Sequence, residues 1–232
     1  EIVDLCNFLV KVGVQIEGIG TSNLKIRGIP ESDNTNRKIS YDIISDRIEA
    51  GTFLVAAAIT KSKITLDNII PSHLECVLSQ LNKIGSVIRV TDNHSITISC
   101  KNNVQPKDIA TDVYPGFPTD MQPQWITLMA TANGVSKVED TVYFDRFSHI
   151  PELVRMGADI SLNKNIACIN GVNKLNGTTV MAGDLRAGAS LVLAALKAKG
   201  ETIVTRIYHI DRGYESFEKK LKSLGADISR II

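Results

Sequence analysis

The feature that most constrains this chain is one pattern that recurs along it. Four times, a stretch with helical periodicity ends in glycine and a strand-like stretch follows, at intervals of about 70 residues. These glycines are Gly13, Gly85, Gly157 and Gly225. A second helical stretch precedes each of the last three, and it opens every time with an aspartate: Asp46, Asp120 and Asp184. The repetition predicts one structural unit used several times, with equivalent helix ends in equivalent places.

Each complete unit is predicted to contain two helices of different character. The aspartate-led helix is rich in alanine and glycine, and small residues on most faces indicate burial among other helices. The second helix is amphipathic, and the glycine at its end fits a left-handed C-terminal cap. The amphipathic helices are expected at 73–84, 149–156 and 214–224, and the strands at 62–66, 87–90, 95–100, 135–139, 159–162, 166–169, 201–205 and 227–231.

The order within a unit reads roughly β-α-β-α-β-β. Three such units, each with an inner and an outer helix, predict an α/β fold in which sheets enclose the inner helices, an inside-out α/β barrel. Residues 28–40 are polar, with proline and glycine, and are the expected domain junction. The chain opens at Glu1 within an amphipathic helix that has no N-terminal cap, and we interpret this as the remainder of a truncated domain.

Composition excludes several classes of protein. The 232 residues are 44% hydrophobic and 22% charged, as in a soluble globular protein of one or two domains. A net charge of +1 gives no reason to expect nucleic acid as a partner. The longest apolar run, 53–59, is too short for membrane insertion, and no signal peptide is visible. Four dispersed cysteines without a CxxC motif indicate reduced thiols in a cytoplasmic protein and no metal site.

The aspartates have two interpretations. Aspartate is a favoured N-cap, worth ~1 kcal/mol, and taken singly each of them is expected to be a cap. If the inner helices run in one direction, however, their positive N-terminal ends meet and form a site for a phosphorylated or carboxylated ligand. The segment 114–119, with two prolines and a glycine, fixes the approach to Asp120. A rigidly held carboxylate suits a general base for a hydroxyl group, and a cap with a stiffened entry is the alternative.

Three arginines lie near the predicted helix starts, and they also have two interpretations. Arg146, Arg186 and Arg212 would suit bidentate recognition of phosphate and carboxylate. Alternatively they pair at the surface with nearby acids, and spacing alone leaves both open. The acids concerned are Asp145, Asp211 and Glu215.

Four motifs occur in a fixed order along the chain: FPTDMQ (117–122), YFDRFSHIPELVRMGA (143–158), DLRAGASLVLAAL (184–196) and RIYHIDRGYE (206–215). Together they resemble the UDP-N-acetylglucosamine 1-carboxyvinyltransferase family of enolpyruvyl transferases. The resemblance covers essentially the whole chain. It implies two similar domains of three units each, with the active site in the cleft between them. Residues 1–45 would be the tail of the first domain and 46–232 the second.

The resemblance also implies an activity. The family transfers the enolpyruvyl group of phosphoenolpyruvate to the 3'-hydroxyl of UDP-N-acetylglucosamine and releases phosphate, without metal or organic cofactor, in the first committed step of peptidoglycan synthesis. By position, Asp120 would contact the sugar hydroxyl as base, and Asp184 would move a proton at the vinyl carbon. Arg212 would bind the charged groups of phosphoenolpyruvate. The remaining substrate contacts would be Val142, Arg146 and Arg186.

The family's loop cysteine and its early lysine would lie upstream of Glu1, in the first domain. We therefore expect the chain to be inactive without that missing N-terminal domain. Two alternatives remain open: a 3-phosphoshikimate 1-carboxyvinyltransferase with the same fold, and a non-catalytic module that binds a sugar nucleotide or phosphate.

Overall fold

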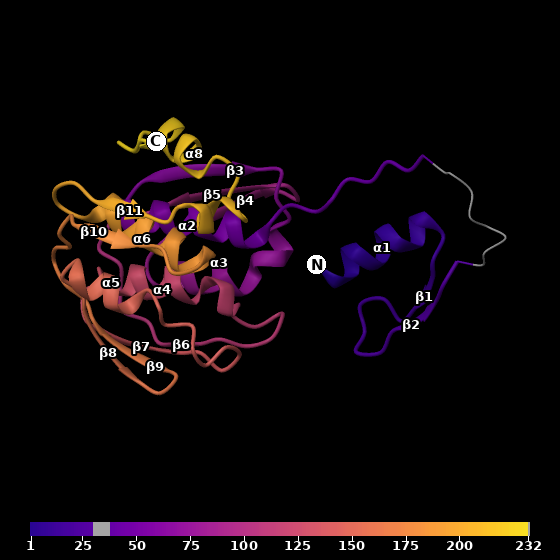
Figure 1. Ribbon diagram of the computed structural model, residues 1–232, viewed down its shortest axis with the longest axis horizontal. Coiled ribbons are helices and arrows are strands. Elements are labelled where there is room, and N and C mark those ends of the chain that lie inside the picture. The colour runs from indigo at the N-terminus through magenta and orange to yellow at the C-terminus, as the bar shows by residue number, and fades with distance from the viewer. Residues whose placement is uncertain (30–37, 232) are drawn as a thin grey trace. The chain divides into compact units, whose positions relative to one another are not determined.

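The computed structural model describes residues 1–29 and 38–231, which form two compact units, Glu1–Ser45 and Asp46–Ile232 (Figure 1). The junction expected at 28–40 lies mostly outside the described residues. The larger unit contains its own hydrophobic core, as an independent domain does.

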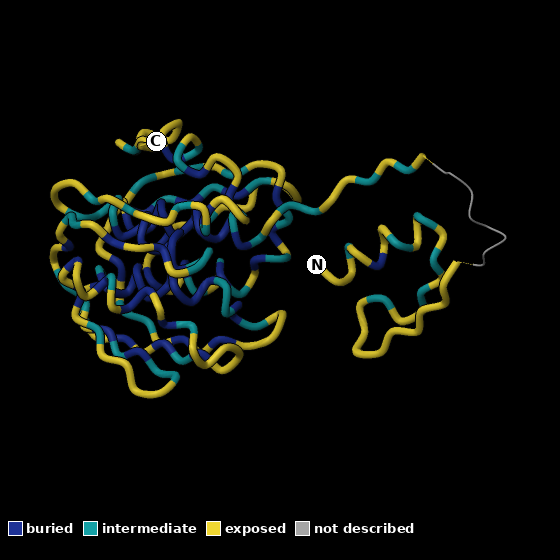
Figure 2. The backbone as a smooth tube through the Cα atoms, in the orientation of Figure 1, coloured by how far each residue is buried: buried dark blue, intermediate teal, exposed yellow. Residues whose placement is uncertain are grey.

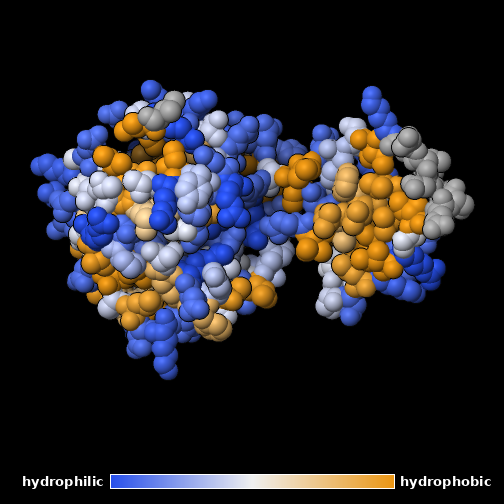
Figure 3. Space-filling view, viewed as in Figure 1, coloured by the Kyte–Doolittle hydropathy of each residue, from blue (hydrophilic) through white to orange (hydrophobic). Residues whose placement is uncertain are grey.

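In the part that the structure describes, the smaller unit contains one helix and a two-stranded antiparallel sheet. Helix α1 (Ile2–Val12) is followed by β1 (Gln15–Glu17) and β2 (Lys25–Arg27). The Tyr41 hydroxyl donates to the Asp4 carboxylate at 2.8 Å and so ties the end of the unit to the helix. Figure 3 shows apolar side chains gathered on this unit, and the exposed ones include Ile2, Val3, Leu5, Val10 and Ile26. A unit of this size cannot bury them by itself.

Three buried helices form the centre of the larger unit: α2 (Arg47–Thr60), α4 (Gln122–Met129) and α6 (Leu185–Lys197). Each contacts the other two, and the buried part of the chain is concentrated here (Figure 2). Small residues permit the close approach that the sequence predicted. A Cβ on Gly51 would lie 2.8 Å from Met121 Sδ, and one on Gly188 would lie 2.6 Å from Ile210 Cγ1.

Three sheets surround these helices. The first has the order β3 (Lys63–Asp67), β5 (Ser95–Ser99), β4 (Val87–Asp92), all antiparallel. The second has the order β6 (Ile109–Ala110), β7 (Val135–Glu139), β9 (Ile166–Asn170), β8 (Asp159–Asn163). The third pairs β10 (Thr179–Met181) with β11 (Ile203–Thr205) in parallel. Helix α4 connects parallel β6 and β7 just as α6 connects β10 and β11, so the repeat is visible in the topology.

The outer helices complete the units. They are η2 (Pro71–Leu74) with α3 (Glu75–Lys83), α5 (Ile150–Arg155), and α7 (Tyr208–Asp211) with α8 (Phe217–Ser223). The glycines after the amphipathic helices all have positive φ, from 94° to 117°, which confirms the predicted caps. The inside-out α/β barrel is likewise confirmed, since sheets surround the buried helices (Figure 1).

The strand predicted at 227–231 is wrong: the described residues after Leu224 contain no strand. A β-rich pattern becomes a strand only where a sheet edge accepts its backbone groups, and neither strand of the third sheet pairs with this segment. No helix in the described ranges combines the length and hydropathy needed to cross a membrane.

Candidate functional site

Two of the three aspartates are caps, and the third is not. Asp46 accepts from the backbone N–H of Ile48 at 2.7 Å, and Asp184 accepts from those of Arg186 and Ala187 at 2.8 Å each. The cap interpretation is wrong for Asp120. It lies inside the 3₁₀ turn η3 (Thr119–Met121) that leads into α4, and its carboxylate points elsewhere.

The Asp120 carboxylate lies between two arginines. Arg146, on the loop before α5, donates from Nη1 to Oδ1. Arg186, in the first turn of α6, donates from Nε and Nη2 to Oδ2 at 3.2 and 2.9 Å. The fold therefore brings together three predicted site residues from separate elements. The alternative pairing of these two arginines with nearby surface acids is wrong, and Asp211 pairs instead with Arg230 at 2.6 Å.

The two arginines control the ionisation of Asp120. Burial alone would raise the pKa of this carboxyl, but hydrogen bonds and charge from Arg146, and then from Arg186, outweigh burial and lower the pKa below its ordinary value. Asp120 is therefore an anion at neutral pH. The three side chains form a charged cluster whose guanidinium groups are suited to phosphate or carboxylate.

A buried polar network supports Arg186 from behind. Arg186 Nη1 donates to the Tyr214 hydroxyl at 3.3 Å, and the guanidinium lies 5.5 Å from the centre of the Tyr214 ring. That hydroxyl is 2.9 Å from Thr52 Oγ1, and Gln124 Nε2 donates to Thr52 at 3.0 Å and to Tyr214 at 3.3 Å. The network joins all three inner helices. Sequence reasoning missed it, although the tyrosine lies in the RIYHIDRGYE motif and a buried tyrosine hydroxyl needs a partner.

The network also bears on the charge of Arg186. Burial would lower its pKa, but Tyr214 and Asp120 outweigh burial and raise it. Arg186 is thus held as a cation in a half-buried position, between the buried Tyr214 and the partly exposed Asp120.

His149 lies beside the start of α6. Ser148 donates to Asp184 Oδ2 at 3.0 Å, and the next residue, His149, is only 1% exposed. Neither imidazole nitrogen has a hydrogen-bond partner among the described residues. Burial lowers the pKa of His149 to about 3, with Arg146 acting in the same direction and Asp184 against it. The imidazole is therefore neutral.

Two predicted residues are not joined to this cluster by any contact. The Arg212 side chain, at the end of α7, is exposed and makes no hydrogen bond or ion pair within the described ranges. Val142 is 42% exposed, and its backbone N–H donates to Asp140 Oδ1 at 3.1 Å, on the loop that leads to Arg146. Both are open to a ligand.

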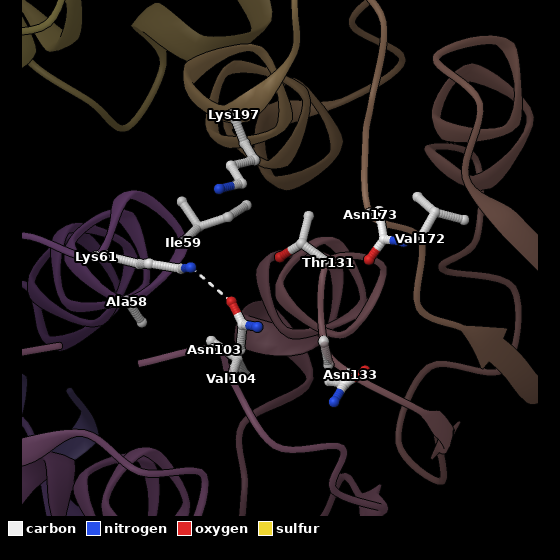
Figure 4. Close-up of a pocket in the computed structure, with 11 residues that line it drawn as sticks. Ala58, Ile59, Lys61, Asn103, Val104, Thr131, Asn133, Val172, Asn173 and Lys197 are labelled. Carbon is white, nitrogen blue, oxygen red and sulfur yellow. Dashed lines mark hydrogen bonds between the residues drawn. The ribbon is translucent and has the colours of Figure 1, made fainter. Parts of the chain in front are cut away.

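The C-terminal ends of the inner helices lie away from Asp120 and carry lysines. A hollow of about 130 Å³ is lined by residues at the C-terminal ends of α2, α4 and α6, among them Lys61, Thr131 and Lys197 (Figure 4). Lys61 donates to Asn103 Oδ1 at 2.5 Å. Cations there offset the negative ends of the helix dipoles, which accounts for these lysines. Because the three C-termini share this hollow, the helices run in one direction, and their positive N-termini lie at the Asp120 end.

Comparison with known proteins decides the family. Residues 1–221 match the family described as EPSP synthase (3-phosphoshikimate 1-carboxyvinyltransferase). This chain belongs to the EPSP synthase family. Over 99% of its length it is 51% identical to a UDP-N-acetylglucosamine 1-carboxyvinyltransferase of Chloroherpeton thalassium, of which it covers 52%. It is 53% identical, over 99% of its length, to the protein of that name from Campylobacter hominis, of which it covers 54%. The resemblance predicted from the motifs is confirmed.

Solved structures agree. The enolpyruvyl transferase NikO from Streptomyces tendae matches 97% of this chain with a TM-score of 0.84 and 28% identity, and the match covers 53% of NikO. EPSP synthase from Acinetobacter baumannii matches 82% of this chain and 45% of its own, with a TM-score of 0.64 and 16% identity, which shows the fold alone. The chain thus spans about half the length of the relatives it matches.

Proposed function

We propose that this chain is part of an enzyme that transfers the enolpyruvyl group of phosphoenolpyruvate to the 3'-hydroxyl of UDP-N-acetylglucosamine. The observation that carries the proposal is the Asp120 carboxylate held between Arg146 and Arg186 at the positive ends of three parallel helices. The names of relatives about 50% identical support this choice of acceptor. Such an enzyme would work in the cytoplasm and commit sugar nucleotide to peptidoglycan, and so to cell-wall growth and division.

The cluster is chemically suited to this reaction. Asp120 would take the proton of the 3'-hydroxyl while that oxygen bonds to C2 of phosphoenolpyruvate, and Asp184 would deliver a proton to the vinyl carbon. The resulting tetrahedral intermediate breaks its C–O bond to phosphate and returns a proton from its methyl group to Asp184, which restores the double bond. The proton held by Asp120 leaves with the phosphate. Arg186 and the exposed Arg212 would balance the charge of the phosphate and carboxylate. Val142 and Arg146 would border the sugar. The proposal assigns no metal or organic cofactor.

The smaller unit fits a protein of two domains. Its exposed apolar residues support the proposal that Glu1–Ser45 is the tail of a first domain and Asp46–Ile232 a second domain. The rest of the first domain would be the principal partner of this chain. We expect the chain alone to release no phosphate.

Phosphate release from phosphoenolpyruvate by the full-length protein tests the proposal. UDP-N-acetylglucosamine and shikimate 3-phosphate are offered separately, and we expect release only with the sugar nucleotide. Release only with shikimate 3-phosphate would show that the acceptor is shikimate 3-phosphate and that the reaction is still enolpyruvyl transfer. A folded protein that releases phosphate with neither acceptor would leave a module that binds anions without catalysis.

Replacing Tyr214 with phenylalanine tests the support of Arg186. The change deletes one hydroxyl, while the bond between Thr52 and Gln124 remains. Because Arg186 loses a partner that fixes its guanidinium, we expect the KM for phosphoenolpyruvate to rise about three- to tenfold with a smaller change in kcat. Initial rates at varied phosphoenolpyruvate measure this. Tyr208→Phe, at an exposed tyrosine, is the control, and an unchanged KM in Tyr214→Phe would show that the hydroxyl does not act on Arg186.

A further inference from the structure

A second aspartate, Asp140, is wholly buried beside the charged cluster and forms no ion pair within the described ranges. Its Oδ1 accepts from Thr111 Oγ1 at 2.8 Å and from the backbone N–H groups of Val142 and Tyr143 at 3.1 and 2.8 Å. Its Oδ2 accepts from Thr119 Oγ1 at 2.7 Å. Burying a carboxylate costs much free energy unless hydrogen bonds satisfy its oxygens, and these four donors do so.

These bonds connect both sides of the Asp120–Arg146 ion pair. Thr119 immediately precedes Asp120, and Val142 and Tyr143 begin the loop that carries Arg146. The two charged side chains therefore depend on one anchor, although they come from different elements.

Asp140 itself is fixed to the sheet. It directly follows β7, and its N–H donates to the Asn165 carbonyl at 2.9 Å. Asn165 Nδ2 donates back to the Asp140 carbonyl at 3.1 Å, from the turn between β8 and β9. A rigid strand end is what an anchor for a precise ion pair requires.

We infer that Asp140, through the Thr119 hydroxyl, is a positioning residue that sets where Asp120 lies between its arginines. The inference rests on the function proposed above, because it concerns the geometry of that reaction. Asp140 and Thr119 act through Asp120. A displacement of about 1 Å in a reacting group can lower a rate about a hundredfold, so an anchor of this kind has a kinetic effect out of proportion to one hydrogen bond.

The test removes the Thr119 hydroxyl in the full-length enzyme. Thr119→Val keeps the shape of the side chain, Thr119→Ala removes the hydroxyl without adding bulk, and Thr119→Ser keeps the hydroxyl. Thr131→Val is the matched control, because the side chain of Thr131 donates to the Leu128 carbonyl at the other end of the helices and makes no other hydrogen bond within the described ranges. Initial rates of phosphate release give kcat and the KM for each substrate.

We expect kcat to fall about tenfold in both Thr119→Val and Thr119→Ala, with the KM for phosphoenolpyruvate changed by less than about twofold. Thr119→Ser and Thr131→Val should stay within about twofold of the wild type. A loss of folded enzyme would also lower the apparent kcat without changing KM, so each rate is divided by the concentration of folded protein. Recovery of the rate in Thr119→Ser then assigns the effect to the hydroxyl. A wild-type kcat in Thr119→Ala, or a serine variant as slow as the alanine one, would overturn the inference.

A second measurement tests the role of the Thr119 hydroxyl without relying on the proposed activity. If the wild type releases no phosphate with either acceptor, amide hydrogen exchange is followed across residues 117–122. We expect exchange to be several times faster in Thr119→Ala than in the wild type or Thr119→Ser, because η3 loses its tie to Asp140. Equal exchange in the alanine variant and the wild type would show that the hydroxyl does not hold this turn.

Discussion

Replacing Asp120 with asparagine is expected to lower kcat of the full-length enzyme about a thousandfold. Asparagine keeps the size of the side chain, but it cannot take a proton from the sugar hydroxyl, and general base catalysis contributes about a hundredfold to ten-thousandfold. The change also leaves Arg146 and Arg186 facing a neutral group in place of a carboxylate. Phosphate release at saturating concentrations of both substrates measures the effect.

Asp145→Asn is the matched control. Asp145 is an exposed carboxylate on the loop that carries Arg146, and its side chain makes no hydrogen bond or ion pair within the described ranges. We expect this variant to keep the wild-type kcat. An Asp120→Asn enzyme within about threefold of the wild type would exclude Asp120 as the base and leave Asp184 as the carboxylate to test.

The parts of the fold that depend on local pattern could be predicted from the sequence. The small-residue helices, the amphipathic helices and their glycine caps follow from spacing along a few turns, as do the caps at Asp46 and Asp184. The repeat then predicted that sheets enclose the inner helices, and it left open whether these helices run in one direction. Where a strand needed a distant partner, as at 227–231, local pattern was insufficient.

The site shows the same division. The sequence could nominate Asp120, Arg146 and Arg186 as charged groups near helix starts, but not that all three form one cluster. Arg186 reaches Asp120 across 66 positions, and Tyr214 reaches Thr52 across 162. Such pairs depend on how whole units pack. Asp140 was missed for a related reason: alone in the sequence it is one more acidic residue, and its four donors converge only in the folded chain.

The second large effect concerns stability in mild acid. Replacing His149 with leucine is expected to remove a large part of the acid sensitivity of this chain. The imidazole is buried with neither nitrogen bonded among the described residues, and its pKa is lowered from 6.5 to about 3. Below pH 6.5 the unfolded chain therefore binds a proton that the folded chain does not. The unfolded state gains stability as pH falls from 6.5 towards 3, at up to about 1.4 kcal/mol per pH unit.

Two neighbours enter this balance. Asp184, whose carboxylate caps α6, favours protonation of His149, whereas burial and Arg146 oppose it. The pKa of His149 is lowered overall, because a charged imidazole would have no hydrogen-bond acceptor in its buried place. Leucine has similar volume and no proton to gain. The free energy of unfolding of the wild type should therefore fall between pH 7 and pH 4.5 by about 2.5 kcal/mol more than that of His149→Leu.

Urea unfolding at both pH values measures this difference. Trp125, the one tryptophan of the chain, is wholly buried in α4, so its fluorescence reports the loss of the inner helices. His94→Leu supplies the same chemical change at an exposed position and should alter the pH dependence by less than about 0.5 kcal/mol. If His149→Leu and the wild type lose the same stability between pH 7 and pH 4.5, the imidazole is charged in the folded protein. It would then share its proton with Asp184 and join the charged groups at the start of α6.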